Sequence, residues 1–184
     1  MDDVSSKDWY QGSFEELAWE KIQGYKEDAD LQKLWFDHYA YIVHSPEGLG
    51  NLKSLLNGEI SVEGLVLDQD RRWDLVNRLS AHAYTGIETI LEREAKRDPS
   101  STGQKAYIAA QSAAPNLENK QKWLANIQDQ ETELALAKLR AAMSSLYPAY
   151  QVEYRKELLA RTLDSLVELD GKKDQQYLKF YSRS

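Results

Sequence analysis

The chain has 184 residues, enough for one domain with a sizeable hydrophobic core or for two small helical subdomains. It carries a formal net charge of −7 and no cysteine. The acidic balance argues against nucleic acid or an anionic membrane surface as a partner, because both require clustered Lys and Arg. The absence of thiols excludes disulfide bonds, thiolate zinc sites and a cysteine nucleophile.

Targeting signals are also missing from the sequence. No apolar run reaches the length that a transmembrane helix needs, and the N-terminal stretch MDDVSSKDW lacks the basic and apolar parts of a signal peptide. We therefore expect a soluble, untargeted protein that resides in the cytoplasm.

The first part of the chain has helical apolar spacing. Ser13 and Glu16 have the spacing of a capping box, which predicts that a helix begins at Ser13. A second helix is expected to start at Asp28 or Asp30. Its predicted buried stripe consists of Leu31, Leu34, Trp35, His38 and Ile42.

Residues 52–79 are the most informative stretch, and they predict a helix, a structured elbow and a second helix. The first of these helices begins at Ser45-Pro46, a cap followed by proline in the first turn, and it is expected to end at Gly58. Asp68 is predicted to cap the second helix through its carboxylate. The structural residues of this elbow are expected to be Gly58, Gly64, Asp68, Asp70 and Trp73.

Further helices are predicted after the elbow by the same spacing. They are expected near residues 87–98, 100–115, 116–127, 136–147 and 159–171. The chain closes on Tyr177, Phe180 and Tyr181, and this aromatic ending favours a natural chain that continues.

Roughly nine or ten short helices with short connections predict an all-α fold. We expect an α-solenoid-like superhelical array of short antiparallel helices, of the HEAT/armadillo kind, although no clean sequence period is present. No linker is strong enough to divide the chain, so residues 1–184 are expected to form a single helical domain.

Motifs for catalysis or metal binding are absent. The three histidines, His38, His44 and His82, do not form the H-E-x-x-H pattern of a zinc hydrolase, and His38 is expected to be a core residue. Neither a G-x-S-x-G elbow nor a phosphate-binding loop occurs. We assign no catalytic residue and no metal ligand.

Arg72 has two possible roles. Together with Arg71 it lies beside Asp68 and Asp70, so local capping and ion pairing would account for it. A guanidinium at a helix start could instead bind a substrate carboxylate through a bidentate pair, provided that it faces a cavity.

Several segments occur in an order and spacing that resemble a known family. They are LKSLLNG, VEGL, DQDRRWDLVNRLSAHAY, RDPSSTGQKAYIAAQSAAP, NKQKW and SSLYPAYQ. From about Leu52 to Phe180 the chain resembles the C-terminal helical domain of the aminopeptidase N family of zinc metallopeptidases, in its bacterial branch.

The resemblance implies a larger enzyme with an upstream catalytic domain in the same chain, which would hold zinc through H-E-x-x-H and carry G-x-M-E-N. Neither motif exists here, so this chain is expected to hold no cofactor and to be inactive alone. Its implied role is to cap the active site and to help bind the peptide substrate.

Two alternatives remain open. A free-standing helical-repeat adaptor could bind partner peptides or proteins in its groove, but such an array needs polar capping helices. The arbitrary-looking start and the aromatic end of the chain favour excision from a larger enzyme. An enzyme with an unrecognised set of catalytic residues is the other alternative.

Overall fold

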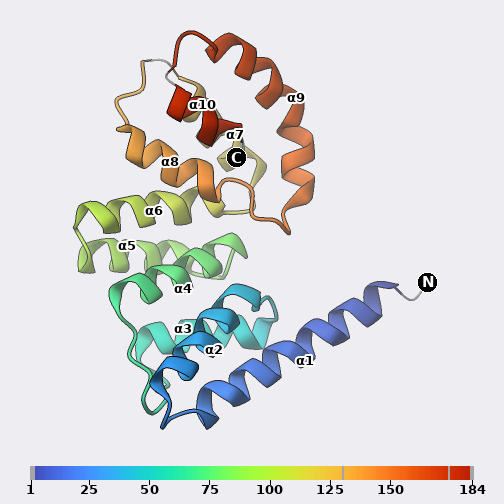
Figure 1. The fold of residues 1–184 in the computed structure, drawn as a ribbon, viewed down its shortest axis with the longest axis vertical. Coiled ribbons are helices and arrows are strands. Elements are labelled where there is room, and N and C mark those ends of the chain that lie inside the picture. The colour runs from blue at the N-terminus through green and yellow to red at the C-terminus, as the bar shows by residue number, and fades with distance from the viewer. Residues whose placement is uncertain (1–2, 130, 174, 183–184) are drawn as a thin grey trace. The chain divides into compact units, whose positions relative to one another are not determined.

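The computed structural model describes residues 3–129, 131–173 and 175–182, with side chains from residue 12 onward. Within these residues the chain forms ten helices and no strand, which confirms the all-α prediction (Figure 1). The helices are α1 (Asp3–Gly24), α2 (Ala29–Ile42), α3 (Pro46–Asn57), α4 (Gln69–Ala81), α5 (Ile87–Arg97), α6 (Ser101–Ala113), α7 (Leu117–Gln128), α8 (Leu136–Ser145), α9 (Val152–Leu169) and α10 (Gln175–Tyr181). No helix of this described part is both long and apolar enough to cross a lipid bilayer.

The helices pack into two compact units, Met1–Leu79 and Ser80–Ser184. The boundary lies in the last turn of α4, inside a continuous helix. Domain boundaries usually fall in exposed Pro-, Gly- or polar-rich linkers. Because this boundary lies inside a helix instead, the sequence shows no linker at this position. A single domain over residues 1–184 and a HEAT/armadillo-like arrangement both stay predictions.

Helix α1 runs through the predicted capping box. Ser13 and Glu16 lie inside this helix, so the predicted start at Ser13 is wrong. No proline precedes Ser13 to stop the helix from extending toward the N-terminus. Ala18 and Ile22 are fully buried, whereas Phe14 is 59% exposed.

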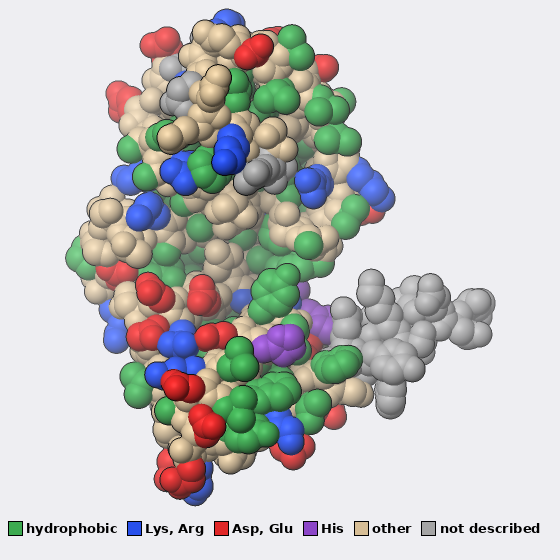
Figure 2. Space-filling model, viewed as in Figure 1, with side chains coloured by type: hydrophobic (Ala, Val, Ile, Leu, Met, Phe, Trp, Pro, Cys, Tyr) green, Lys and Arg blue, Asp and Glu red, His purple; other side chains and the backbone are tan. Residues whose placement is uncertain are grey.

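Helix α2 buries a different face from the predicted one. Leu34 is 64% exposed and His38 is exposed, so the expected core histidine is a surface residue. Figure 2 shows hydrophobic side chains gathered on the surface over α2. Gln32 occupies the buried face because its Nε2 donates to the carbonyls of Ile22 at 2.9 Å and Glu63 at 2.8 Å. The buried positions are Gln32, Phe36, Tyr39 and Ala40.

Both ends of α3 follow the predicted chemistry. Ser45 Oγ accepts a hydrogen bond from the Gly48 N–H at 3.0 Å, and Pro46 occupies the first turn. Gly58 ends the helix with a φ of 70°, a left-handed conformation that glycine adopts without steric cost.

Replacing this glycine should destabilise unit Met1–Leu79. We expect Gly58→Ala to lower the free energy of unfolding by about 1 kcal/mol, because a Cβ is strained at positive φ. Gly50 lies within α3 and has open space around it, so Gly50→Ala should raise that free energy by about 0.5–1 kcal/mol. Urea unfolding of both variants measures the difference, and equal effects would contradict the conformational argument.

In unit Ser80–Ser184, helices α6 and α8 lie side by side (Figure 1). The hydrophobic core beside them contains Trp123, Leu124, Ile127, Leu139, Met143, Leu146, Leu158, Tyr177 and Tyr181. The buried residues of α9 are Leu158, Ser165 and Leu169. Leu159 and Leu163 are about half exposed.

Candidate functional site

The elbow between α3 and α4 is a tightly specified loop. Gly64 has a φ of 84°, and a Cβ there would lie 2.9 Å from Gln32 Oε1 and 3.1 Å from the Lys26 carbonyl oxygen. Glycine therefore lets the loop lie close to α2. Asp68 caps α4 as predicted, because its Oδ1 accepts a hydrogen bond from the Arg71 N–H at 2.9 Å.

Arg71 is the arginine that binds carboxylates in this elbow. Its Nε and Nη2 donate to the two oxygens of Asp37 at 2.9 and 3.0 Å, and its Nη1 donates to Asp68 Oδ2 at 2.6 Å. Hydrogen bonding to Asp37 raises the pKa of Arg71, and the Arg71 backbone N–H lowers the pKa of Asp68. This bidentate pair ties the start of α4 to α2.

Arg72 lies on the inner side of α4. It is buried, and its Nη2 donates to the Leu56 carbonyl in the last turn of α3 at 3.2 Å. Trp73 beside it is also buried, while Asp70 is exposed in the first turn. A guanidinium so placed holds two helices together, whereas a substrate clamp has to reach an open cavity.

Ser45, Glu15 and His44 form a cluster that resembles a catalytic triad in composition only. Glu15 Oε2 accepts from Ser45 Oγ at 2.5 Å, and Glu15 Oε1 contacts His44 Nδ1 at 2.5 Å. The carboxylate thus lies between the hydroxyl and the imidazole, so the histidine contacts the carboxylate instead of serving as the base for Ser45. The cluster instead ties α1 to the start of α3.

The other two histidines make aromatic contacts. His82 stacks on Tyr150 with ring centroids 4.7 Å apart, and His38 meets Trp35 edge-on at 6.3 Å. Among the residues whose positions are described, no group of three or more His, Asp or Glu side chains is arranged to hold a metal ion.

The C-terminal end of α6 is the most elaborate polar site of unit Ser80–Ser184. Side chains cap the successive carbonyls of residues 111–115. Asn119 binds the first at 2.9 Å, and the Tyr154 hydroxyl binds the last at 2.7 Å. Lys120 and Gln151 bind the carbonyls between these two. The Nε2 atom of Gln151 donates to the carbonyls of Ala113 at 2.9 Å and Ala81 at 2.7 Å. Side chains therefore replace the water that usually satisfies a helix end.

Lys120 is at the centre of this polar site and is fully buried. Its ammonium donates to the carbonyls of Ser112 at 2.9 Å, Ala113 at 3.1 Å and Leu146. Leu146 follows the last residue of α8. One cation therefore binds the C-terminal ends of both α6 and α8, where the helix dipoles favour positive charge.

Three of the segments that carry the family resemblance meet at this site. The segment AAQSAAP supplies the carbonyls of Ser112 and Ala113, and NKQKW supplies Lys120. SSLYPAYQ supplies the Leu146 carbonyl and the Gln151 amide. These three segments therefore act together to cap the C-terminal end of α6, which is a structural role.

The buried ammonium makes stability depend on pH. Burial lowers the pKa of Lys120 from 10.5 to about 7. Between these two values the unfolded chain binds more protons, so the free energy of unfolding rises as pH increases from about 7 to about 10. Wild type should gain stability relative to Lys120→Met across this window in urea titrations. Parallel pH profiles would contradict the assignment.

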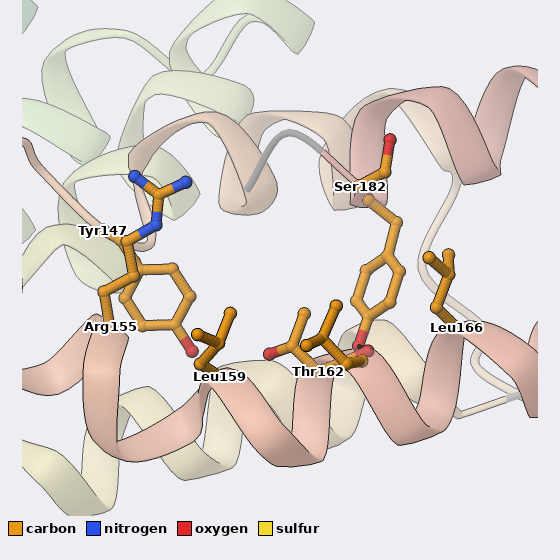
Figure 3. A pocket seen from close by; sticks show the side chains of 8 residues that line it. Tyr147, Arg155, Leu159, Thr162, Leu166 and Ser182 are labelled. Carbon is orange, nitrogen blue, oxygen red and sulfur yellow. Dashed lines mark hydrogen bonds between the residues drawn. The ribbon is translucent and has the colours of Figure 1, made fainter.

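Beside α9 lies a hollow of about 90 Å³ (Figure 3). Arg155 and Tyr147 stand at one end, Leu166 and Ser182 at the other, and Leu159 lies along α9. Its complete lining is Tyr147, Arg155, Leu159, Thr162, Leu163, Leu166, Tyr181 and Ser182. Sequence reasoning did not identify this hollow, although the leucine spacing of α9 was visible.

Two tyrosines, Tyr147 and Tyr181, line this hollow. Burial raises the pKa of Tyr147 to about 12, an effect that the Thr162 hydroxyl partly offsets. The Tyr181 hydroxyl accepts a hydrogen bond from Gln128 Nε2 at 2.8 Å and pairs with the Ser165 hydroxyl at 2.5 Å. The Tyr147 phenol therefore stays protonated at neutral pH, and the rings of Tyr147 and Tyr181 form walls of the hollow.

The sequence matches none of the protein-family models compared with it. Over 88 residues it is 35% identical to aminopeptidase N from Streptomyces lividans. The match covers 47% of this chain and 10% of the Streptomyces protein, so the matched segment is about a tenth of that relative's length. This partial match supports a relation to aminopeptidase N.

Proposed function

We propose that this chain is the non-catalytic, C-terminal helical part of a bacterial zinc aminopeptidase, an enzyme that removes N-terminal amino acids from peptides. In that enzyme it would cap the active site and contribute to binding of the peptide substrate. The observation that carries the proposal is the 35% identity to aminopeptidase N over 88 residues.

The internal chemistry of the chain agrees with a non-catalytic role. Three of the segments that resemble the family cap the C-terminal end of α6 around Lys120. The contacts of Glu15 with Ser45 and His44 join α1 to the start of α3. Zinc and the water that it activates would therefore belong to the upstream catalytic domain of the same chain.

The proposed role is one of shape. A HEAT/armadillo-like array of the helices would form a concave surface over the catalytic domain and enclose the peptide. Enclosure of an active site excludes bulk water and restricts entry, which suits an enzyme that acts on free N-termini. We place the enzyme in the cytoplasm.

The native protein provides the test. An antibody against this chain should recover from source cells a polypeptide several-fold heavier than 21.2 kDa. That polypeptide should release N-terminal amino acids from peptides, and a zinc chelator should abolish the release. The isolated chain should show no such activity with or without zinc.

A different result would favour the adaptor alternative. Recovery of a native species at 21.2 kDa would contradict the proposed function. The chain would then be a free-standing helical protein that binds partner peptides. Zinc-dependent hydrolysis by the isolated chain would contradict both functions.

A further inference from the structure

The C-terminal end of α3 has a sequence that is chemically reactive in a flexible chain. Asn57 is followed by Gly58, and every other asparagine precedes a larger residue. The backbone nitrogen that follows an asparagine can attack the side-chain carbonyl carbon, and glycine obstructs that attack least because it has no Cβ. Both residues are exposed, so water reaches the site.

The reaction would convert the side-chain amide of Asn57 into an acid. The Gly58 nitrogen forms a bond to Asn57 Cγ and gives up its proton to water. The bond from Cγ to Nδ2 breaks, and that nitrogen takes a proton from water and leaves as ammonia. One water molecule then opens the resulting cyclic imide at either carbonyl, which gives aspartate or isoaspartate. No electrons are transferred, and water is the only co-reactant.

The folded end of α3 blocks the first step. The Gly58 N–H donates to the Leu55 carbonyl at 3.1 Å, so its nitrogen is directed along the helix and holds its proton. Asn57 Nδ2 donates to Glu59 Oε1 at 2.9 Å, which fixes the amide beside a carboxylate. Asn57 is the last residue of α3, and Leu55 and Leu56 before it are buried. Attack on Asn57 therefore requires this anchored turn to open.

Glu59 adds an electrostatic obstacle. Its carboxylate accepts hydrogen bonds from Lys53 at 2.6 and 2.8 Å and from Ser54 at 3.1 Å. Hydrogen bonds from Lys53, Asn57 and Ser54 lower the pKa of Glu59 to about 2, so this carboxylate is ionised at neutral pH. Attack on Asn57 would develop negative charge on its side-chain oxygen next to this anion, and like charges at such short range repel each other.

We propose that Asn57 is a latent deamidation site, which the folded end of α3 keeps unreactive and which converts to isoaspartate when that end opens. Residue 57 would then mark every chain in which the elbow between α3 and α4 has come apart. The site lies within unit Met1–Leu79 and does not depend on the proposed function.

The conversion works in one direction only. Isoaspartate lengthens the main chain by a methylene group. The N–H groups of Gly58 and Glu59 then cannot both return to the carbonyls of Leu55 and Ser54, which they reach at 3.1 and 2.8 Å. Either product also places a carboxylate beside Glu59 at the C-terminal end of a helix, where the dipole disfavours negative charge.

Peptide mapping of the purified chain tests the site. Trypsin releases residues 54–71, in which Asn57 is the only asparagine. After incubation at neutral pH this peptide should show the mass of an amide-to-acid conversion, and electron-transfer fragmentation should identify isoaspartate at residue 57. The chain unfolded in guanidinium chloride should convert at least about tenfold faster than the folded chain. Equal rates in the two states, or no conversion in either, would overturn the proposal.

Two variants separate the protection by the folded turn from the reactivity of the sequence. Glu59→Gln should speed conversion of the folded chain about fivefold, because it removes the anion beside Asn57. Glu63→Gln is the matched control, since Glu63 is an exposed carboxylate of the same elbow that pairs with Lys26. In guanidinium chloride both variants and wild type should convert at the same rate. Equal rates for all three folded chains would overturn the role of Glu59.

Refolding after conversion tests whether the change is one-way. Wild type that has converted in guanidinium chloride and is then refolded should unfold at a lower urea concentration. Its N–H groups at Gly58 and Glu59 should exchange faster with solvent. Asn57→Gln treated in the same way should refold unchanged, because glutamine closes the larger ring far more slowly. A converted chain with the stability and exchange rates of untreated protein would overturn the loss of this turn.

Discussion

Lys120→Met is expected to lower the free energy of unfolding of unit Ser80–Ser184 by about 3 kcal/mol. Methionine matches the length and flexibility of the lysine stem, so the packing of α7 should survive. What is lost is a buried ammonium that binds three carbonyls at the ends of α6 and α8. Each buried carbonyl that loses its partner costs about 1–3 kcal/mol, and relaxation or water entry recovers part of the total.

The desolvation of Lys120 acts in the opposite direction. A fully buried cation is costly, and replacing a buried ion pair by apolar residues is often neutral or stabilising. That exchange works when both partners are removed, but here the carbonyls belong to the backbone and remain. We therefore expect that in Lys120→Met the cost of leaving these carbonyls without a donor exceeds the gain from removing the buried charge.

Chemical denaturation and hydrogen exchange would measure this effect. Lys122→Met is the matched control, because Lys122 is exposed on the same helix and should change stability by less than about 0.5 kcal/mol. Faster exchange should appear in the N–H groups of α6 and α8 for Lys120→Met alone. An unchanged or raised unfolding free energy in Lys120→Met would show that desolvation dominates.

Helix ends were predictable because their chemistry is local. Ser45 and Ser100 each accept a hydrogen bond from the N–H three residues later, and Asn116 does the same. Gly58 adopts the left-handed conformation that ends α3. Each of these arrangements depends on a few neighbouring residues, so the sequence pattern contains them.

The buried faces of α2 and α9 were not predictable in the same way. Gln32 is fully buried on α2 because two backbone carbonyls from elsewhere in the fold accept its amide protons. Ser165 is buried on α9 because it meets the Tyr181 hydroxyl. A polar residue is suited to the core only when a distant partner satisfies it, and hydrophobic periodicity has no information on that partner.

The arginines and lysines show the same limit. Arg71 and Arg72 are adjacent in the sequence. Arg71 pairs with the Asp37 carboxylate, whereas Arg72 is buried and donates a hydrogen bond to the Leu56 carbonyl. Lys120 did carry a signal, since it falls on the apolar spacing of Trp123 and Ile127. A lysine at a core position indicates a buried acceptor, but the sequence does not say which carbonyls those are.

Glu15→Ala is expected to lower the free energy of unfolding of unit Met1–Leu79 by about 2–4 kcal/mol. Only 5% of the Glu15 side chain is exposed, and its oxygens accept hydrogen bonds from the backbone N–H groups of His44 and Ser45 at 3.0 and 3.3 Å. The Ser45 hydroxyl and the His44 imidazole add two more contacts at 2.5 Å each. Alanine would leave these partly buried donors without an acceptor.

Glu15→Gln and Glu16→Ala are the comparison variants for this loss of stability. Glutamine keeps one acceptor oxygen but turns an amide toward a donor, so we expect a loss of about 1–2 kcal/mol. Glu16 is the exposed neighbour on α1, and its alanine variant should lie within about 0.5 kcal/mol of wild type. Urea unfolding should therefore rank Glu16→Ala, Glu15→Gln and Glu15→Ala in increasing order of destabilisation.

Hydrogen exchange at the junction between α2 and α3 provides an independent readout. The N–H groups of His44 and Ser45 should exchange faster in Glu15→Ala, because their acceptor is gone. The N–H of Gly48 should change less, because Ser45 Oγ still accepts its hydrogen bond. If all three amides were protected as in wild type, Glu15 would contribute packing alone, and the anchoring of α1 to α3 would have to come from the apolar contacts of Ala18 and Ile22.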